Sequence, residues 1–194
     1  MKPIAIREIL LKNNRQVFTT QEFERLFQIK GHRAKYFLEQ QTKQDLFIRL
    51  KRGLYALKTD LISEEEIANK LYVPSYISFE YALAFHSVIP EMVYTITCAT
   101  TKPTRLFNAN NREFAYFTIK KSAYTGYIMK KNGSRQILVA TPEKAFVDYL
   151  YYVSLGRKSP NDRFQTKKLD KNMTLQYARL FQREKLIKLV KSLC

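Results

Sequence analysis

The sequence predicts an α+β protein in which a mainly helical part precedes a part built around a sheet. Three observations lead to this prediction. Residues 1–58 carry three helical patterns and then a hairpin pattern, residues 93–140 carry several strand patterns, and residues 157–194 return to amphipathic helices. A chain of 194 residues has room for one domain or two small ones, at about 100–200 residues each. We therefore expect a first domain over residues 1–58 and a second over residues 59–194.

Composition and charge narrow the class of partner. Hydrophobic residues make up 45% of the chain and charged residues 26%, which is typical of a globular protein. Lys and Arg total 34 against 17 Asp and Glu, so the net charge is +17 at pH 7. Such an excess repels itself in the folded state unless a polyanion lies nearby. Nucleic acid is therefore the leading partner class.

Uncharged runs are short throughout the sequence. The charge-free run from Met92 to Thr101, for example, is well short of the ~18 apolar residues that a membrane helix needs. Arg7 and Glu8 interrupt the apolar residues near the start of the sequence. We expect no signal peptide, no spanning helix and no membrane partner. Two Cys and two His residues show none of the paired spacings of a zinc site, so we expect no metal, no disulfide and a cytoplasmic location.

Three helices are expected in the first part of the chain. Pro3 suits the first turn of the first helix. Thr19, followed three residues later by Glu22, has the pattern of a capping box and begins the second helix. A third helix is expected over residues 32–44, after a break at Gly31.

The third helix has two different faces, and a basic hairpin follows it. The apolar side carries Ala34, Phe37, Leu38 and Gln41. The polar and basic side carries His32, Arg33, Lys35, Tyr36, Gln40 and Lys43. Two β-prone runs lie between Leu46 and Leu57 and are joined at Arg52-Gly53, which indicates a hairpin. Three helices followed by a basic hairpin predict a winged helix-turn-helix.

This arrangement predicts binding to double-stranded DNA, with the region upstream of the chain's own gene as the expected target. The third helix is expected to enter the major groove, while Arg49, Lys51 and Arg52 lie along phosphates or in the adjacent minor groove. The alternative is a small helical bundle whose charged face is only solvated. Element order, turn position and whole-chain charge all agree with DNA, so DNA binding is the favoured interpretation.

The second part is expected to hold a mostly antiparallel sheet flanked by helices. Ser63 marks a helix start, and a helix over residues 79–88 is stopped by Pro90. Strands are expected at Val93–Ala99, Glu113–Ile119, Tyr127–Lys131 and Gln136–Ala140, with an Asn132-Gly133 turn between the last two. Thr141 then caps a helix that has Pro142 at its first position.

Two further segments bear on nucleic acid. Residues 157–194 form a basic helical tail, with eleven Lys or Arg residues against three Asp or Glu residues. This tail is either a second polyanion-binding patch, with RNA as one candidate ligand, or a solvated helical surface. The segment Lys120–Tyr127 interleaves lysines with tyrosines of the kind that stack on bases. An RNA-binding module is therefore an alternative function.

Three segments occur in an order and spacing that point to one family. They are Arg52–Tyr55 after the three helices, Ser78–His86 (SFEYALAFH) and Ala140–Asp148 (ATPEKAFVD). Together they resemble the AbiEi family of type IV toxin-antitoxin antitoxins. One position departs from the family pattern, because Ser87 follows the histidine where such proteins more often have a glycine.

The resemblance implies both a fold and a function. It implies an N-terminal winged helix that represses its own operon, with Arg49, Lys51 and Arg52 at the wing. It also implies a C-terminal domain needed to neutralise a nucleotidyltransferase toxin, in a system linked to phage defence. A winged-helix repressor without a toxin partner is the alternative within this interpretation.

The residues do not favour an enzyme. No Asp or Glu is followed two residues later by Lys, so the carboxylate-x-Lys pattern of restriction-type nucleases is absent from the sequence. The five glycines, at positions 31, 53, 126, 133 and 156, never form a phosphate-binding loop. We therefore expect no catalytic residues and no cofactor.

Overall fold

The computed structural model of this chain describes residues 2–58, 62–132 and 135–193. Within these ranges the chain forms eight α-helices, nine strands and two short 3-10 helices. The strands make a three-stranded and a six-stranded sheet, in which most neighbouring strands run antiparallel. The α+β class expected from the sequence is confirmed.

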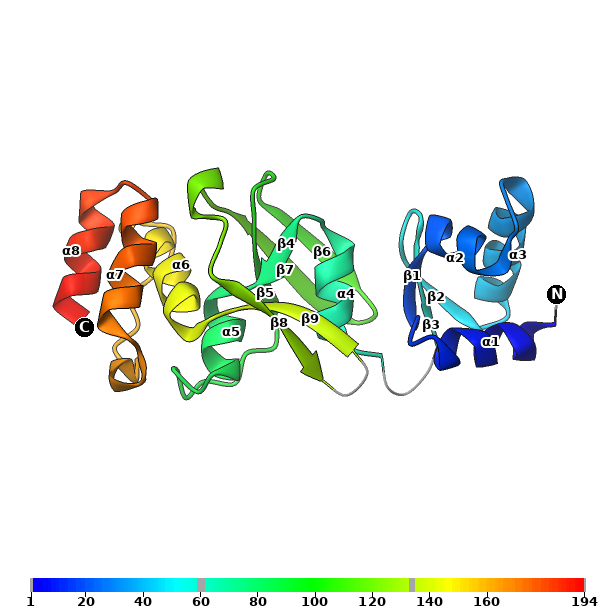
Figure 1. Ribbon diagram of the computed structural model, residues 1–194, viewed down its shortest axis with the longest axis horizontal. Coiled ribbons are helices and arrows are strands. Elements are labelled where there is room, and N and C mark those ends of the chain that lie inside the picture. Colours follow the sequence, from blue (N-terminus) through cyan, green and yellow to red (C-terminus); the bar gives the residue numbers. More distant parts are fainter. Residues whose placement is uncertain (1, 59–61, 133–134, 194) are drawn as a thin grey trace.

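The first part of the chain folds as three helices and a three-stranded antiparallel sheet (Figure 1). Its elements are α1 (Pro3–Lys12), β1 (Val17–Thr19), α2 (Thr20–Phe27), α3 (His32–Lys43), β2 (Phe47–Lys51) and β3 (Leu54–Leu57). The sheet has the order β1-β3-β2, so the short strand before α2 pairs with the second arm of the hairpin. We call residues 2–58 the N-terminal unit.

Local sequence signals explain where α2 begins and ends. The Thr19 hydroxyl accepts a hydrogen bond from the backbone N–H of Glu22 (3.1 Å), and the Glu22 carboxylate accepts one from the N–H of Thr19 (2.7 Å). This is the expected capping box. At the other end Gln28 adopts the left-handed conformation (φ 54°), and the Ile29 N–H donates to the Glu24 carbonyl. The helix therefore stops there, and the chain turns toward α3.

Aromatic side chains form the core of the N-terminal unit. Phe18, Phe23 and Phe47 are buried and come from β1, α2 and β2. The ring centroids of Phe18 and Phe47 lie 5.3 Å apart in an edge-on arrangement. Leu38 of α3 packs into the same cluster. The inner side of α3 is thereby held against the sheet, and the outer side is left in solvent.

The second part of the chain contains the six-stranded sheet, of order β6-β7-β5-β4-β9-β8. We call its described residues, 62–132 and 135–193, the C-terminal unit. Its elements are α4 (Glu64–Leu71), β4 (Ser75–Ile77), α5 (Phe79–Phe85), β5 (Ile96–Thr100), β6 (Arg105–Ala109), β7 (Arg112–Thr118), η1 (Lys121–Ala123), β8 (Tyr127–Asn132), β9 (Arg135–Ala140), α6 (Pro142–Ser154), η2 (Thr166–Lys168), α7 (Lys171–Leu180) and α8 (Glu184–Leu193).

Helices cover both faces of this sheet. The Tyr116 hydroxyl of β7 donates a hydrogen bond to the Ala68 carbonyl of α4 (2.6 Å). The next side chain along β7, Phe117, packs against Phe79 of α5, with ring centroids 5.0 Å apart. Because successive side chains of a strand point to opposite faces, α4 and α5 lie on opposite sides of the sheet.

Several expected boundaries are corrected by the structure. The helix expected over 79–88 ends at Phe85, because Ser87 adopts the left-handed conformation (φ 54°) and the Val88 N–H reaches back to the Leu83 carbonyl (2.8 Å). The strand expected at Val93–Ala99 runs instead over Ile96–Thr100. The expected Asn132-Gly133 turn extends outside the described residues, although β8 and β9 pair antiparallel on either side of it.

The two units pack against each other through the hairpin. Leu50 and Leu54 of the hairpin share one buried cluster with Ile67 and Leu71 of α4. The expected boundary between residues 58 and 59 adjoins residues 59–61, which lie outside the described part of the chain. In Figure 1 the N-terminal unit lies at one end of an elongated molecule, and α7 and α8 lie at the other.

Candidate nucleic-acid interface

The polar side of α3 is exposed. His32, Arg33, Lys35, Tyr36 and Lys43 are exposed, and Gln40 is half-buried. Tyr36 leaves 65% of its surface in solvent, an unusual position for a large ring. Within the described residues, none of the cations on this helix forms an ion pair. Their charges are therefore available to an external anion.

The hairpin presents two of its three predicted cations to solvent. Arg49 lies in β2 and Arg52 at the turn, and both side chains are exposed. Gly53 closes the turn with φ 77°, a conformation that favours glycine. The Gly53 carbonyl accepts a hydrogen bond from the Thr20 N–H (3.0 Å), so the turn is tied to the start of α2.

Lys51 has a different position from the other two. Its Nζ donates a hydrogen bond to the Leu71 carbonyl at the end of α4 (2.6 Å). Burial, followed by the nearby charges of Lys102 and Arg105, lowers the pKa of Lys51. The structure therefore brings Lys51 to the boundary between the two units, next to two cations that the sequence analysis did not select.

A groove of about 780 Å³ lies at this boundary. Five cations line it, and no Asp or Glu does. They are Lys51, Arg52, Lys70, Lys102 and Arg105. Sequence reasoning missed Lys102 and Arg105 because β6 was not expected. The available signal was the pair of cations in the six residues after the expected strand at Val93–Ala99.

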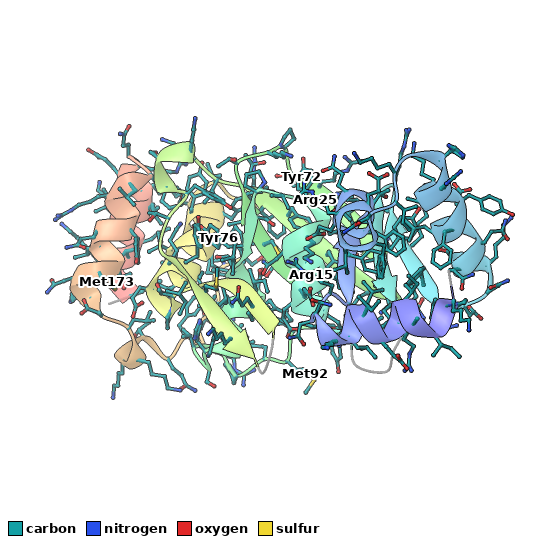
Figure 2. All side chains as sticks on the ribbon, turned by 45° about the vertical axis from the view of Figure 1, so that its right-hand side comes forward. Arg15, Arg25, Tyr72, Tyr76, Met92 and Met173 are labelled. Atoms are coloured by element: carbon teal, nitrogen blue, oxygen red, sulfur yellow. The ribbon has the colours of Figure 1, made fainter. Side chains whose placement is uncertain are left out.

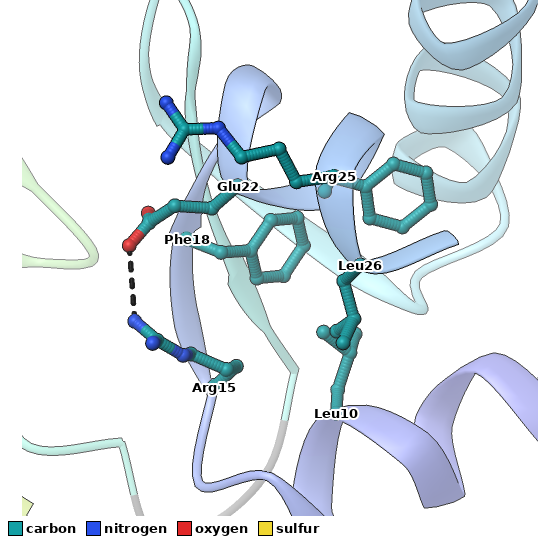
Figure 3. A pocket seen from close by; sticks show the side chains of 7 residues that line it. Leu10, Arg15, Phe18, Glu22, Arg25 and Leu26 are labelled. Atoms are coloured by element: carbon teal, nitrogen blue, oxygen red, sulfur yellow. Dashed lines mark hydrogen bonds and ion pairs between the residues drawn. The ribbon is translucent and has the colours of Figure 1, made fainter. Parts of the chain in front are cut away.

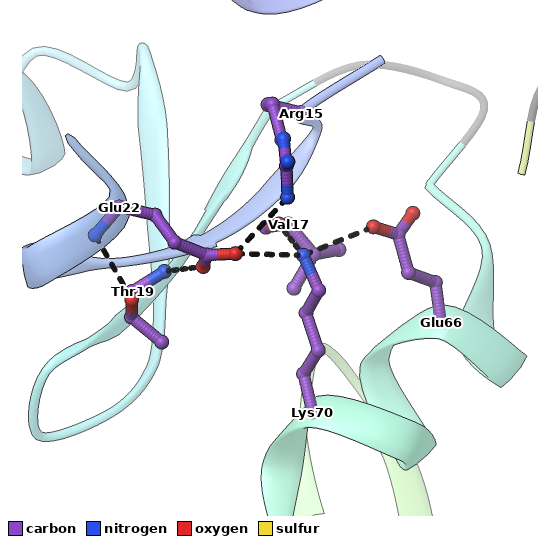
Figure 4. A network of polar contacts seen from close by, with 6 residues as sticks. All are labelled: Arg15, Val17, Thr19, Glu22, Glu66 and Lys70. Carbon is purple, nitrogen blue, oxygen red and sulfur yellow. Dashed lines mark hydrogen bonds and ion pairs between the residues drawn. The ribbon is translucent and has the colours of Figure 1, made fainter. Parts of the chain in front are cut away.

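A polar network beside the groove holds the two units together (Figure 4). The Lys70 ammonium of α4 donates a hydrogen bond to the Val17 carbonyl of β1. It also lies 3.8 Å from the Glu22 carboxylate and 3.4 Å from that of Glu66. Arg15 Nη1 lies 3.1 Å from the same Glu22 oxygen. Residues on α2, β1 and α4 are thus fixed relative to one another.

The chemistry of Glu22 agrees with this network. Burial would raise the pKa of the Glu22 carboxyl, but the Thr19 hydrogen bonds and the charges of Lys70 and Arg15 together outweigh burial and lower the pKa. Glu22 is therefore charged at neutral pH. It balances Lys70, which leaves Lys51, Arg52, Lys102 and Arg105 as the groove cations without an ion-pair partner in the described residues.

A smaller cavity of about 250 Å³ lies within the N-terminal unit, beside α1 and α2 (Figure 3). Its wall includes Leu10, Phe18 and Leu26, and the Arg15–Glu22 ion pair lies at its edge. These residues belong to the core and to the network described above. The cavity collects no group of side chains suited to catalysis.

The structure does not bring the basic tail together with α3. Helices α7 and α8 lie at the opposite end of the molecule (Figure 1), whereas the tail cation Lys158 forms an ion pair with Glu80 of α5. Another tail cation, Arg183, donates hydrogen bonds to the Ser154 hydroxyl (2.9 Å) and carbonyl (2.8 Å) at the end of α6. That cation therefore has a packing role within the C-terminal unit.

The tyrosines considered for RNA stacking are half-buried and pack against a buried ring. The rings of Tyr124 and Tyr127 lie 5.1 and 4.7 Å from the ring of Tyr76, measured between centroids. Tyr76 is fully buried within the C-terminal unit (Figure 2). One face of the Tyr127 ring stacks on Tyr76, and the Tyr124 ring packs at a tilt against both, so part of each ring is used inside the protein and not for base stacking.

A buried polar cluster lies along the first half of α6. The Asp148 carboxylate accepts hydrogen bonds from Ser78 (2.7 Å), Tyr76 (2.9 Å) and the Lys144 ammonium. Burial raises the pKa of Asp148 and lowers that of Lys144. Both side chains have no exposed surface, so a substrate has no access to them. This cluster joins α6 to Tyr76 of β4 and to Ser78, which directly follows β4.

Neither membrane nor metal features stand out in the described ranges. No helix there combines the length and apolar character needed to cross a bilayer. The same residues contain no group of three His, Cys, Asp or Glu side chains placed to hold a metal ion. Comparison with known proteins adds no assignment. No protein-family model and no curated protein sequence matches this chain.

Proposed function

We propose that this chain is a DNA-binding transcriptional regulator. In this proposal residues 1–58 form a winged helix-turn-helix domain and residues 59–194 a second domain. The observation that carries it is the exposed polar side of α3 together with a basic hairpin turn in the same unit, with cations that lack acidic partners among the described residues. The third helix enters the major groove, and Arg49 and Arg52 contact phosphates or the adjacent minor groove.

Two observations favour DNA over RNA. The rings of Tyr124 and Tyr127 are half-buried and pack against Tyr76, which weakens the argument for base stacking. The exposed groups of α3 lie instead on one side of a regular helix, which has the width to enter a major groove of B-form DNA. The deep, narrow major groove of an RNA duplex does not admit such a helix.

A direct comparison of ligands tests this proposal. Fluorescence anisotropy measures binding of the full chain to a duplex from the region upstream of its gene, to a shuffled duplex of equal composition, and to tRNA. The upstream duplex should bind most tightly. Tighter binding of tRNA would support the RNA alternative and contradict the proposal.

We also propose that the chain is an antitoxin that counteracts a nucleotidyltransferase toxin, without a catalytic activity of its own. This part rests on the resemblance of Arg52–Tyr55, Ser78–His86 and Ala140–Asp148 to the AbiEi family. A neighbouring gene for a nucleotidyltransferase-like protein, expressed with and without the full chain, provides the test. If the full chain does not relieve the growth arrest, the antitoxin proposal is contradicted and only the proposal of a repressor remains.

One variant separates the two activities. The double substitution R33A/Q40A alters only the outer side of α3, so it should abolish repression of a reporter and still relieve toxicity. Loss of both activities in a folded variant would contradict the division of labour between the two domains.

A further inference from the structure

The groove between the units places cations from two distant parts of the sequence side by side. Lys51 and Arg52 come from the hairpin, whereas Lys102 and Arg105 come from β6 and the loop before it. Lys51 is close enough to Lys102 and Arg105 for their charges to lower its pKa. Holding like charges together costs free energy, which a bound polyanion relieves.

The two C-terminal cations are held in position by their surroundings. Lys102 Nζ lies 5.3 Å from the centre of the Tyr72 ring, and the Arg105 guanidinium lies 4.9 Å from that of Phe107. The Tyr72 hydroxyl donates a hydrogen bond to the Pro103 carbonyl (3.2 Å), between the two cations.

The backbone beside them is also fixed. The Thr118 hydroxyl donates a hydrogen bond to the Lys102 carbonyl (2.7 Å), and its backbone N–H donates to the Thr104 hydroxyl (3.1 Å). Charges held in place in this way lose less entropy when they bind than charges on free side chains.

The hairpin turn links this groove to the proposed DNA-binding face. In Figure 1 the turn stands between β6 on one side and α2 on the other, with α3 beyond α2. Arg52 belongs to both regions, since it lies at the turn and lines the groove. The network of Lys70, Glu22 and Glu66 keeps the two sides of the groove at a fixed separation.

We propose that this groove binds the phosphate backbone of the same duplex that α3 contacts, on the flank that passes the hairpin. Lys102 and Arg105 of the C-terminal unit contact phosphates there, together with Arg52. The contact adds affinity without sequence preference, because it reaches no base edge. This inference rests on the proposed function and extends it, because the C-terminal unit becomes part of the DNA-binding surface.

Charge-removing variants of the full chain test the groove. K102A/R105A removes two cations from the β6 edge of the six-stranded sheet. K130A/K131A removes two exposed cations from β8, which is the opposite edge of the same sheet, and is the matched control. Each lost phosphate contact should reduce the slope of log K against log salt by about 1. K102A/R105A should therefore reduce the slope by about 2 on both the upstream and the shuffled duplex. K130A/K131A should leave the slope unchanged on both.

Two further measurements sharpen the result. The charge-preserving variant K102R/R105K should retain the wild-type slope, which distinguishes lost charge from altered folding. Hydroxyl-radical footprinting should show that K102A/R105A loses protection on one flank only. If K102A/R105A shows the same salt slope and the same footprint as the wild type, the groove proposal is overturned and the proposed function is unaffected. Failure of the wild-type chain to bind either duplex would overturn both.

Discussion

On α3, side chains of different chemistry share one exposed face. Arg33 and Gln40 both have planar groups that can make paired hydrogen bonds to a base edge. Arg52, at the hairpin turn, lies where a phosphate contact is expected. Single substitutions can therefore distinguish side chains that recognise the base sequence from side chains that bind phosphates.

Substitution of Arg33 or Gln40 by alanine should weaken binding to the upstream duplex by roughly 1–3 kcal/mol, with little effect on the shuffled duplex. R52A should weaken binding to both duplexes by the same factor. Equilibrium anisotropy on the two duplexes measures both effects. R7A, which removes an exposed cation from α1, is the control. Equal losses on both duplexes for R33A would remove Arg33 from the sequence-reading face.

Ser87 provides a test of backbone conformation. It adopts φ 54° directly after the C-cap of α5, where a glycine carries no steric cost. Ser87→Gly should therefore stabilise the protein, by about 1 kcal/mol or less. Urea unfolding of both proteins gives the difference in the free energy of unfolding. Destabilisation by this change would show that the Ser87 side chain has a role beyond the turn.

His86 should make stability depend on pH. Burial lowers its pKa, and this effect exceeds the opposing effect of the Ala140 carbonyl, which lies 2.8 Å from Nε2. The folded state therefore binds the proton less readily than the unfolded chain, in which a histidine titrates near 6.5. Neutral His86 therefore contributes its full stability above about pH 6.5. This contribution is lost as the pH falls below that value, by at most about 1.4 kcal/mol for each pH unit.

Urea unfolding at pH 7.5 and pH 5.5 measures this loss. His86→Gln keeps an amide that can donate to the Ala140 carbonyl but does not titrate, so its stability should fall less on acidification. The same pH dependence in H86Q and in the wild type would assign the acid sensitivity to other groups.

At the level of elements, α6 shows how sequence signals and buried chemistry combine. The helix begins where the sequence predicts. The Thr141 hydroxyl accepts a hydrogen bond from the Lys144 N–H (3.3 Å), and Pro142 lies in the first turn. The ion pair between Lys144 and Asp148 was not predicted from the sequence. A pair four residues apart on a helix is usually exposed, and here Tyr76, Ser78 and Phe181, the C-cap residue of α7, pack around it.

Breaking this pair should be costly. D148N leaves the Lys144 ammonium buried without its counter-charge, and K144M leaves the Asp148 carboxylate in the same condition. Each single variant should lose roughly 3–5 kcal/mol of unfolding free energy, and K144M/D148N should lose less than the sum. K188A on the exposed side of α8 should change stability by less than about 0.5 kcal/mol. Additive losses would show that the two charges act independently.

The elements that sequence could predict are those with local signals. The Thr19 and Glu22 capping box, the Ser63 cap and the Arg52-Gly53 turn were all found where expected. The strands β4 and β6 were missed for different reasons. β4 has only three residues, whereas β6 is an edge strand whose side chains are mostly exposed, so neither shows the alternation that marks a half-buried strand.

For the whole molecule, the sequence predicted the α+β class and the two-part order of its elements, but not how the parts meet. The charge of +17 indicated a polyanion partner. Contacts of Lys51 and Lys70 across the junction join residues up to 53 positions apart in the chain, and no local pattern encodes them. The basic groove, with Lys102 and Arg105 on its far side, follows from that packing alone.

The salt dependence of DNA binding tests the central claim, that the N-terminal unit docks on duplex DNA with its cations replacing counterions. The measurement is the affinity of the full chain for the duplex upstream of its gene over a series of salt concentrations. If about six phosphates are contacted, log K should fall against log salt with a slope near −5 or steeper. Absence of binding to this duplex in low-salt buffer, or an affinity that does not change with salt, would contradict the account.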